Sequence, residues 1–252
     1  MRLKHWACFL VVLPVWAQAR VFDINKESFA SYISFNGGSS NVGEGAFESE
    51  TSQSLTYSSK VKYNYSGEFG FLYSTPYANF RFGFEIIKPQ SLTNVVASNS
   101  SGAELYSVKS ELTGIAPKAG MEITLRRSKD SRSMIVGHGG MASLTMTNDY
   151  ILTSAGQAAF SGVADHSVQA KASAVTWGGG IAHESLLSDT TTLMLEAGYR
   201  SLKFDRLKYT KDVTTFSGAK TVGDAVTMTN GENRTLDFSS YYVTLALRIY
   251  LF

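Results

Sequence analysis

The sequence contains little cysteine and, beyond residue 19, no long apolar run. Its one cysteine, Cys8, lies in the N-terminal stretch that we expect to be removed, so disulfides are excluded from the rest of the chain. No later stretch approaches the roughly twenty apolar residues of a transmembrane helix. If the chain enters a membrane it must therefore do so as a closed β-barrel, whose strands satisfy each other's backbone groups.

An excess of one charge is also lacking. The full chain has 23 basic and 21 acidic residues, and two of the basic ones, Arg2 and Lys4, lie in the expected leader. The mature chain is then formally neutral and has no acidic tail. This excludes a global basic field of the kind that recruits nucleic acid, so we expect no nucleic-acid partner.

Residues 1–19 have the pattern of a cleaved secretory signal peptide. They begin with two basic residues, continue with an apolar run at 6–16 and end in Ala17-Gln18-Ala19, where the small residues Ala17 and Ala19 mark the cleavage site. We expect the mature chain, residues 20–252, to fold as one domain without a separate periplasmic module.

The C-terminal stretch from Tyr241 to Phe252 alternates apolar and polar residues, which is a strand signal. Segments of the same kind recur along the chain, and eight can be delimited. They are Ser28–Phe35, a second that begins near Lys60 and is clearest at Glu68–Tyr73, Asn79–Ile87, a fourth that ends in Met121–Leu125, Met134–Met146, Ala170–His183, Thr191–Ser201 and Tyr241–Phe252.

Long and short connections alternate strictly between these segments. We expect long loops at 36–54, 89–110, 147–169 and 203–236, and short turns after the second, fourth and sixth strands. This asymmetry is typical of an antiparallel up-and-down transmembrane barrel with both termini at the short-turn end. In the fourth loop, residues 225–229 still alternate, which predicts strands that project beyond the membrane as a ribbon.

When the apolar and aromatic faces are placed toward lipid, the other faces carry charges into the lumen. Four acids then meet four bases: Glu68, Arg81, Glu85, Lys118, Glu122, Glu196, Arg200 and Arg248. The interior of an eight-stranded barrel is only just wide enough to be filled by its own side chains. Because lone buried charges are costly, we predict a salt-bridged plug rather than a gated ion path or a buried binding site.

The last residues present a conflict between two placements. Tyr250 and Phe252 share the parity of Arg248, which either enters the lumen or reaches the membrane rim from the lipid face. We expect Arg248 in the lumen, because it completes the charge balance. Tyr250 and Phe252 are then interpreted as a C-terminal assembly signal at the rim.

Candidate catalytic groups are few. His138, His166 and His183 remain after the leader, and a Ser/His/acid set near the outer leaflet would indicate a lipid-modifying enzyme. His183 is followed by Glu184 and Ser185, but it lies beside a predicted short turn. We therefore favour polar residues at the membrane interface and no enzymatic activity.

Metal and cofactor signatures are missing too. The histidine spacing fits no zinc motif, so we expect neither a metal nor a cofactor. Gly178-Gly179-Gly180 lies inside a strand and is explained by close strand packing or barrel curvature. Aromatic residues such as Trp177, Tyr199, Tyr73 and Tyr250 are expected in interfacial girdles.

With its signal peptide, eight alternating segments, loop parity and terminal Tyr250-Leu251-Phe252, the chain resembles the small eight-stranded outer-membrane barrels, the family of OmpX and the OmpA transmembrane domain. The resemblance implies an outer-membrane protein with extracellular loops and periplasmic termini, in contact with lipid, lipopolysaccharide and the barrel assembly machinery. It implies adhesion, recognition or a structural role through the loops, for an unknown extracellular partner, and we expect a monomer. A narrow porin-like or OmpW-like channel is the alternative, and a lipid-A-modifying enzyme a third.

Overall fold

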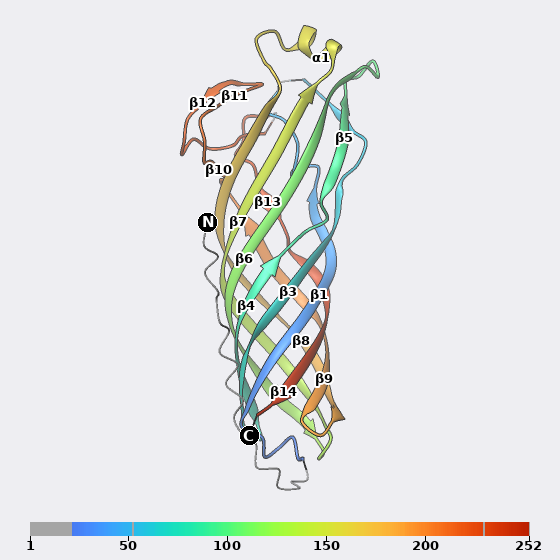
Figure 1. Ribbon diagram of the computed structural model, residues 1–252, viewed down its shortest axis with the longest axis vertical. Coiled ribbons are helices and arrows are strands. Elements are labelled where there is room, and N and C mark those ends of the chain that lie inside the picture. Colours follow the sequence, from blue (N-terminus) through green and yellow to red (C-terminus); the bar gives the residue numbers. More distant parts are fainter. Residues whose placement is uncertain (1–21, 52, 229, 252) are drawn as a thin grey trace, which may run out of the picture.

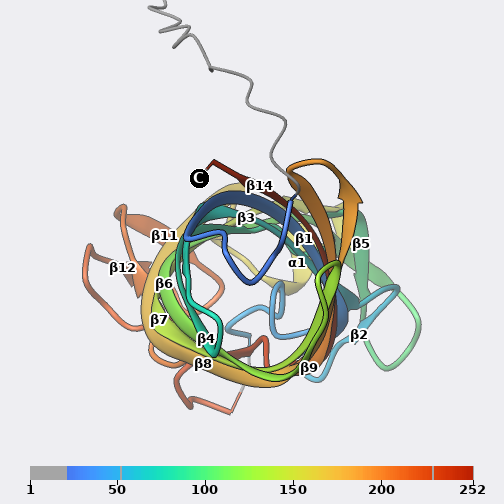
Figure 2. The ribbon, with the colours of Figure 1, turned by 90° about the horizontal axis from the view of Figure 1, so that it is seen from below.

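In the computed structural model, which describes residues 22–251 apart from 52 and 229, the chain forms a closed antiparallel β-barrel (Figure 1). Within these residues eight strands make the wall, each paired with its neighbours in sequence order. The last strand pairs back to the first, which closes the ring seen in Figure 2. The strands are β1 (Phe29–Gly43), β3 (Val61–Ser74), β4 (Ala78–Ile87), β6 (Glu104–Arg127), β7 (Ser131–Leu152), β8 (His166–Ser188), β9 (Thr191–Phe204) and β14 (Ser240–Tyr250). The predicted fold class is confirmed.

The alternation of long and short connections is confirmed as well. Residues 75–77, 128–130 and 189–190 make the short turns at one end, which we call the short-turn end. The long connections gather at the other, the long-loop end. They contain the minor elements β2 (Thr56–Tyr57), β5 (Leu92–Ser98), α1 (Ser154–Ala159), β10 (Lys208–Tyr209), β11 (Val213–Thr215), β12 (Gly218–Lys220) and β13 (Leu236–Asp237).

Several strands are longer than predicted. β1, β6, β7 and β8 extend past their predicted ends toward the long-loop end, and β5 pairs with β6 within the second connection. The predicted loops at 36–54, 89–110 and 147–169 are therefore too long. The reason is that the backbone ladder continues where the outward side chains are no longer apolar. The ribbon predicted in the fourth connection is limited to short strands and isolated bridges, such as Lys208 with Ala225.

The outer wall carries a continuous belt of exposed apolar side chains. On β14 the outward residues run from Tyr241 to Ile249, a span that matches the roughly 9–11 residues with which a tilted strand crosses a bilayer. Exposure of so many large apolar groups is unfavourable in water and is the signature of a lipid-facing surface. The outer belt includes Ile33, Phe35, Phe69, Phe71, Phe80, Phe82, Ile86, Met121, Ile123, Ile135, Val175, Ile181, Leu193, Leu195, Val243, Leu245, Leu247 and Ile249.

Among the predicted girdle aromatics, Trp177, Tyr199 and Tyr73 are exposed on the outer wall. The prediction is wrong for Tyr250, which is 3% exposed and lies inside the barrel. Its parity is that of Arg248, and strand alternation sends both side chains to the same face.

Above the outer belt, the two faces of the wall exchange character. The outer face becomes polar, with exposed Lys109 and Glu111 on β6 and Lys171 on β8. The inner face there is apolar and packs against Phe47 from the first long connection and Phe238 from the fourth. We call this cluster the upper core; it fills the barrel at the long-loop end as the core of a water-soluble domain would.

At the short-turn end, residues 22–27 cross the opening, as Figure 2 shows from below. Ile24 is fully buried in a cluster with Leu72 and Tyr250, and its backbone N–H donates to the carbonyl of Lys129 at 3.2 Å. The Phe22 ring meets the Tyr250 ring edge-on. This segment caps the lower opening.

The predicted leader and its cleavage site fall in residues 1–21, which, like Phe252, lie outside the described residues. Within the part of the chain that the structure describes, no helix is long and apolar enough to span a membrane.

Candidate functional site in the filled lumen

All eight predicted lumen charges are buried inside the barrel. Their side chains come from strands of the wall, and none of the eight residues is more than 7% exposed. Since period-two alternation fixes the face of every residue on a regular strand, the apolar outer belt and the charged interior are two aspects of one pattern.

Glu85 connects two cations in the part of the network nearest the upper core. Arg200 Nη1 lies 2.7 Å from Glu85 Oε1, and Lys118 Nζ lies 3.3 Å from Glu85 Oε2. Lys118 also contacts Glu68 at 2.8 Å. Ser66 donates to Glu85 Oε1 at 2.5 Å, whereas among the described residues Glu85 Oε2 has the ion contact with Lys118 but no hydrogen bond. Each of these charges therefore has a partner of opposite sign, which is what burial of ions requires.

Arg81 joins three carboxylates across the lumen. Its guanidinium lies 3.1 Å from Glu196, 3.4 Å from Glu122 and 3.7 Å from Glu68. Tyr242 donates to Glu196 at 2.6 Å and so supports the first of these partners from the far side. Strands β4, β3, β6 and β9 are thus tied together through one side chain.

Near the short-turn end the network includes two residues that the prediction missed. Glu184 accepts from Arg248 at 2.8 Å and from Arg132 at 2.8 Å, and Tyr250 donates to it at 2.8 Å. Arg132 also donates to Asn79 at 2.9 Å.

The predicted balance of four acids and four bases is therefore incomplete. Among the described residues, five carboxylates face five cations in what we call the charge network: Glu68, Glu85, Glu122, Glu184, Glu196, Arg81, Lys118, Arg132, Arg200 and Arg248.

Sequence parity contains a signal for both missing residues. Glu184 lies on β8, the sixth strand of the wall, and has the parity of Thr176 and Gly178, which alternation assigns to the inner face. The prediction instead grouped Glu184 with His183 beside the turn. Arg132 lies in a polar stretch that resembles a turn, but β7 begins at Ser131, so Arg132 is a strand residue that faces inward.

Glycines make room for the aromatic groups of the charge network. The Tyr32 hydroxyl donates to Glu68 at 2.5 Å and lies where a Cβ on Gly83 would be. His138 lies against Gly178 in the same way, with its Nε2 2.6 Å from the Cβ position. As expected, the Gly178-Gly179-Gly180 run thus allows the His138 side chain and the neighbouring backbone to approach closely.

The three histidines have different environments. His138 is half-buried and faces the lumen, where its ring lies 6.0 Å from that of Tyr242, so its assignment to the membrane interface is wrong. His166 stacks on Tyr150 beneath the long connections. His183 faces outward near the short turns, and its Nδ1 lies 3.0 Å from Ser133 Oγ. These histidines do not converge, and the described part of the chain contains no metal-binding group of histidine, cysteine or carboxylate residues.

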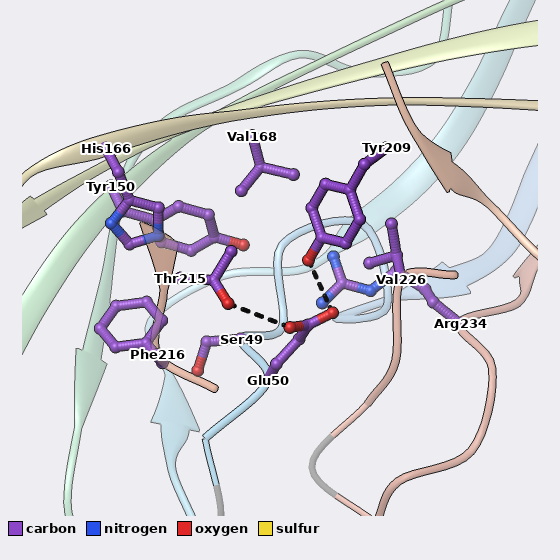
Figure 3. A pocket seen from close by; sticks show the side chains of 10 residues that line it. All are labelled: Ser49, Glu50, Tyr150, His166, Val168, Tyr209, Thr215, Phe216, Val226 and Arg234. Carbon is purple, nitrogen blue, oxygen red and sulfur yellow. Dashed lines mark hydrogen bonds between the residues drawn. The ribbon is translucent and has the colours of Figure 1, made fainter. Parts of the chain in front are cut away.

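Glu50 in the first long connection is held by the fourth, a contact that no sequence pattern indicated. Its carboxylate accepts from Tyr209 at 2.6 Å, from Ser217 at 2.5 Å and from the Thr227 N–H at 2.8 Å; Figure 3 shows Tyr209 and Thr215 directed at it. Burial alone would raise the pKa of Glu50, but these hydrogen bonds outweigh it and hold the pKa below its usual value.

We call the contacts of Glu50 with Tyr209, Ser217 and Thr227 the clasp, because they hold the first connection to the fourth. Arg234 is 1% exposed and lies beside Glu50 in this clasp. It donates to the carbonyl of Glu48. A cavity of about 10 Å³ remains among these side chains, which is the size of one water molecule. The long connections are thus folded into the mouth of the barrel by specific polar contacts rather than extended into solvent.

No protein-family model and no curated protein sequence matches the chain. Solved structures with a similar backbone include three bacterial proteins. A major outer membrane protein from Thermus thermophilus has 10% identity and a TM-score of 0.46 over 88% of this chain and 99% of that one. Ail, the attachment invasion locus protein of Yersinia pestis, has 9% identity and a TM-score of 0.45 over the same shares. The outer membrane protein OprG from Pseudomonas aeruginosa has 11% identity and a TM-score of 0.41 over 91% and 97%. The geometry of the chain itself is that of a small transmembrane β-barrel with a filled lumen.

Proposed function

We propose that the protein is an integral outer-membrane barrel that acts without catalysis, through its long-loop end, in adhesion, recognition or envelope structure. The observation that carries this proposal is the filling of the lumen. Residues 22–27 cap the short-turn end, the charge network occupies the middle, and the upper core closes the mouth. With the interior used in this way, the surface left for a partner is the outside of the long-loop end.

The rigidity of that end supports a binding role. The clasp between Glu50 and Tyr209 and the packing of Phe47 fix the first and fourth connections against the wall. A surface ordered in advance loses less conformational entropy when it binds, so it can recognise a partner with moderate contact area.

We further propose that the long-loop end is extracellular and that both termini are periplasmic, the arrangement of bacterial barrels with long outer loops. In this orientation the outer belt contacts lipid, and the polar wall above it reaches the lipopolysaccharide layer. The barrel assembly machinery would recognise the C-terminal residues Tyr250 and Phe252. Closure of the ladder within one chain needs no second copy, which supports a monomer.

Whole-cell binding tests the surface role. Cells that express the protein would be treated with a protease that cleaves exposed connections, or would carry shortened versions of the second and third connections. These two connections are chosen because the contacts of Glu50 hold the first connection to the fourth. The deletions would spare the upper-core residues of the second and third connections, which are Leu92, Val95, Ala97 and Phe160. Loss of cell binding with retained barrel assembly is the expected result. Unchanged binding after removal of both would contradict a role through these connections.

Planar-bilayer recording tests the alternative of a narrow channel. We expect the inserted barrel to show no steady conductance, because the charges along the lumen are paired within the charge network. Large and sustained currents would show that the network opens, and would replace the surface role with a transport role.

A further inference from the structure

Two neighbouring hollows lie on the outer wall near the short-turn end. One, of about 350 Å³, is lined mostly by apolar side chains of the outer wall, among them Leu125, Ile181 and Leu195. The other, of about 240 Å³, is lined by Arg126, Arg127 and serine hydroxyl groups, and also by Arg132, whose guanidinium points into the lumen. Ser133 and His183 line both, so the apolar hollow continues into the basic one.

A β-bulge turns Arg126 toward this surface. The pairing of β6 with β7 runs from Thr124 opposite Met134 directly to Arg126 opposite Ser133, and leaves Leu125 without a partner. Without the bulge, Arg126 would share the inward face of Glu122 and Thr124. With it, Arg126 is exposed beside Leu125 on the outside. Bulges at barrel rims commonly redirect side chains in this way, and they are retained where the side chain has a role.

Arg126, Ser133 and His183 form a row across three strands. Arg126 is paired with Ser133, Ser133 is paired with His183, and the hydroxyl and imidazole are already 3.0 Å apart. Among the described residues lining the basic hollow there is no carboxylate. Arg127 is engaged by the Tyr77 ring at 4.9 Å and the Pro76 carbonyl at 3.0 Å, whereas within the described chain no hydrogen bond or ion pair engages the Arg126 side chain.

We propose that this surface is a binding site for one anionic glycerophospholipid of the leaflet at the short-turn end. The phosphate lies on the row of Arg126, Ser133 and His183, and an acyl chain lies in the apolar hollow along Leu125, Ile181 and Leu195. Guanidinium, hydroxyl and imidazole groups supply donors to phosphate oxygens, and a basic hollow without carboxylates favours a headgroup without an ammonium group. The leaflet is the periplasmic one if the orientation given under Proposed function holds, and the site rests on that proposal.

Binding, rather than hydrolysis, follows from the partners of His183. A nucleophilic serine needs a base whose second nitrogen is oriented by an acid. Within the described residues no carboxylate is hydrogen-bonded to His183. The adjacent Glu184 points into the lumen, where Arg132 and Arg248 hold it.

Fluorescence quenching tests the site. Trp177 is the only tryptophan of residues 20–252, so a protein with Trp177→Phe and Leu193→Trp carries one reporter on the outer wall beside the apolar hollow, without changing a residue that lines it. It would be refolded into phosphatidylcholine vesicles that contain either brominated phosphatidylglycerol or brominated phosphatidylcholine at equal mole fraction. We expect the anionic lipid to accumulate at the reporter by about fivefold, roughly the contribution of one arginine near a membrane surface.

The double variant Arg126→Gln/His183→Asn should abolish the preference in the reporter protein. Lys171→Gln, which removes one positive charge at the other end of β8, should retain it. Equal quenching by the two lipids, or a preference that survives the double variant, would overturn the proposal. Release of lysophospholipid from the vesicles, measured by mass spectrometry, would overturn the assignment as a binding site. Failure of the barrel to insert at all, seen as loss of heat-modifiable electrophoretic mobility, would instead contradict the proposed membrane location.

Discussion

Arg248 on β14 and Glu184 on β8 meet inside the barrel, with Nη1 2.8 Å from Oε2, although their strands are not hydrogen-bonded to each other. β9 lies between them in the wall. The ion pair therefore links parts of the barrel that the backbone ladder connects only indirectly. Contacts of this kind make the interior a structural element in its own right.

Replacing Glu184 with glutamine should destabilise the barrel strongly. The change leaves Arg132 and Arg248 without their shared carboxylate in a buried position, and loss of one partner in such a group costs about 3–5 kcal/mol. Urea unfolding in lipid vesicles, followed by the fluorescence of Trp177, measures the free energy of unfolding. The matched control is Glu111→Gln, whose ion pair with Lys109 is half exposed and screened by solvent, so its loss should change the stability little. Similar losses for the two variants would contradict a stabilising role of the charge network.

The glycine opposite Tyr32 should not tolerate a methyl group. In Gly83→Ala the new Cβ would overlap the Tyr32 hydroxyl and lie 2.7 Å from Glu68 Oε1, so we expect a loss of about 1–3 kcal/mol. Combination with Tyr32→Phe, which removes the overlapping hydroxyl, should recover part of that loss. Gly137→Ala is the control, because nothing lies within 4 Å of its added Cβ. The absence of any coupling between Gly83→Ala and Tyr32→Phe in the same unfolding assay would rule out this packing.

Tyr250→Phe should cost about 1–3 kcal/mol of unfolding free energy, because the Tyr250 hydroxyl donates to Glu184 and its loss leaves a buried acceptor with one partner fewer. Tyr199→Phe on the outer wall removes an exposed hydroxyl and should be nearly neutral. If the two variants unfold at the same urea concentration, the lumen position of Tyr250 has no energetic consequence. Assembly in cells should be retained in Tyr250→Phe, since the ring is kept.

Acid should loosen the clasp around Glu50. The pKa of Glu50 is lowered in the folded protein, so its hydrogen bonds contribute stability above the unfolded pKa, which is about 4.3. That contribution is lost as the pH falls through the lower, folded pKa. A spin label at Val222→Cys, on the exposed part of the fourth connection, should become more mobile in this range.

In Glu50→Gln the same label should be equally mobile at neutral and acidic pH, because the titrating group is gone. Heat-modifiable mobility at each pH would show that the barrel itself remains folded. Label mobility in the parent protein that does not change between neutral pH and a pH well below the unfolded pKa would contradict the role of Glu50.

The residues of β4 and β14, the third and eighth strands of the wall, show how much of the fold could be predicted from the sequence. Phe80, Phe82 and Ile86 alternate with Arg81 and Glu85, and the structure places the first set outside and the second inside. A lipid environment imposes this pattern, because each outward residue must be apolar while each inward one fills a narrow lumen. The inward position of Arg248 follows from the same rule.

Local departures from alternation limited the prediction. Arg126 is turned outward by a bulge, and the polar residues around Arg132 resembled a turn, although β6 and β7 continue through most of them. Above the outer belt, apolar residues face inward and polar ones outward, so the pattern of lipid-facing alternation predicts strands that end too early.

The sequence by itself determined the barrel: its strands, the faces that meet lipid and lumen, and the alternation of long and short connections. These are consequences of period-two geometry in a bilayer, and they can be seen one strand at a time. The tertiary structure alone decided which charges pair across the lumen, how Glu50 and Arg234 draw the long connections into the mouth, and where Arg126, Ser133 and His183 come together. Each of these depends on the closure and stagger of the ring, which bring side chains from distant strands to the same height.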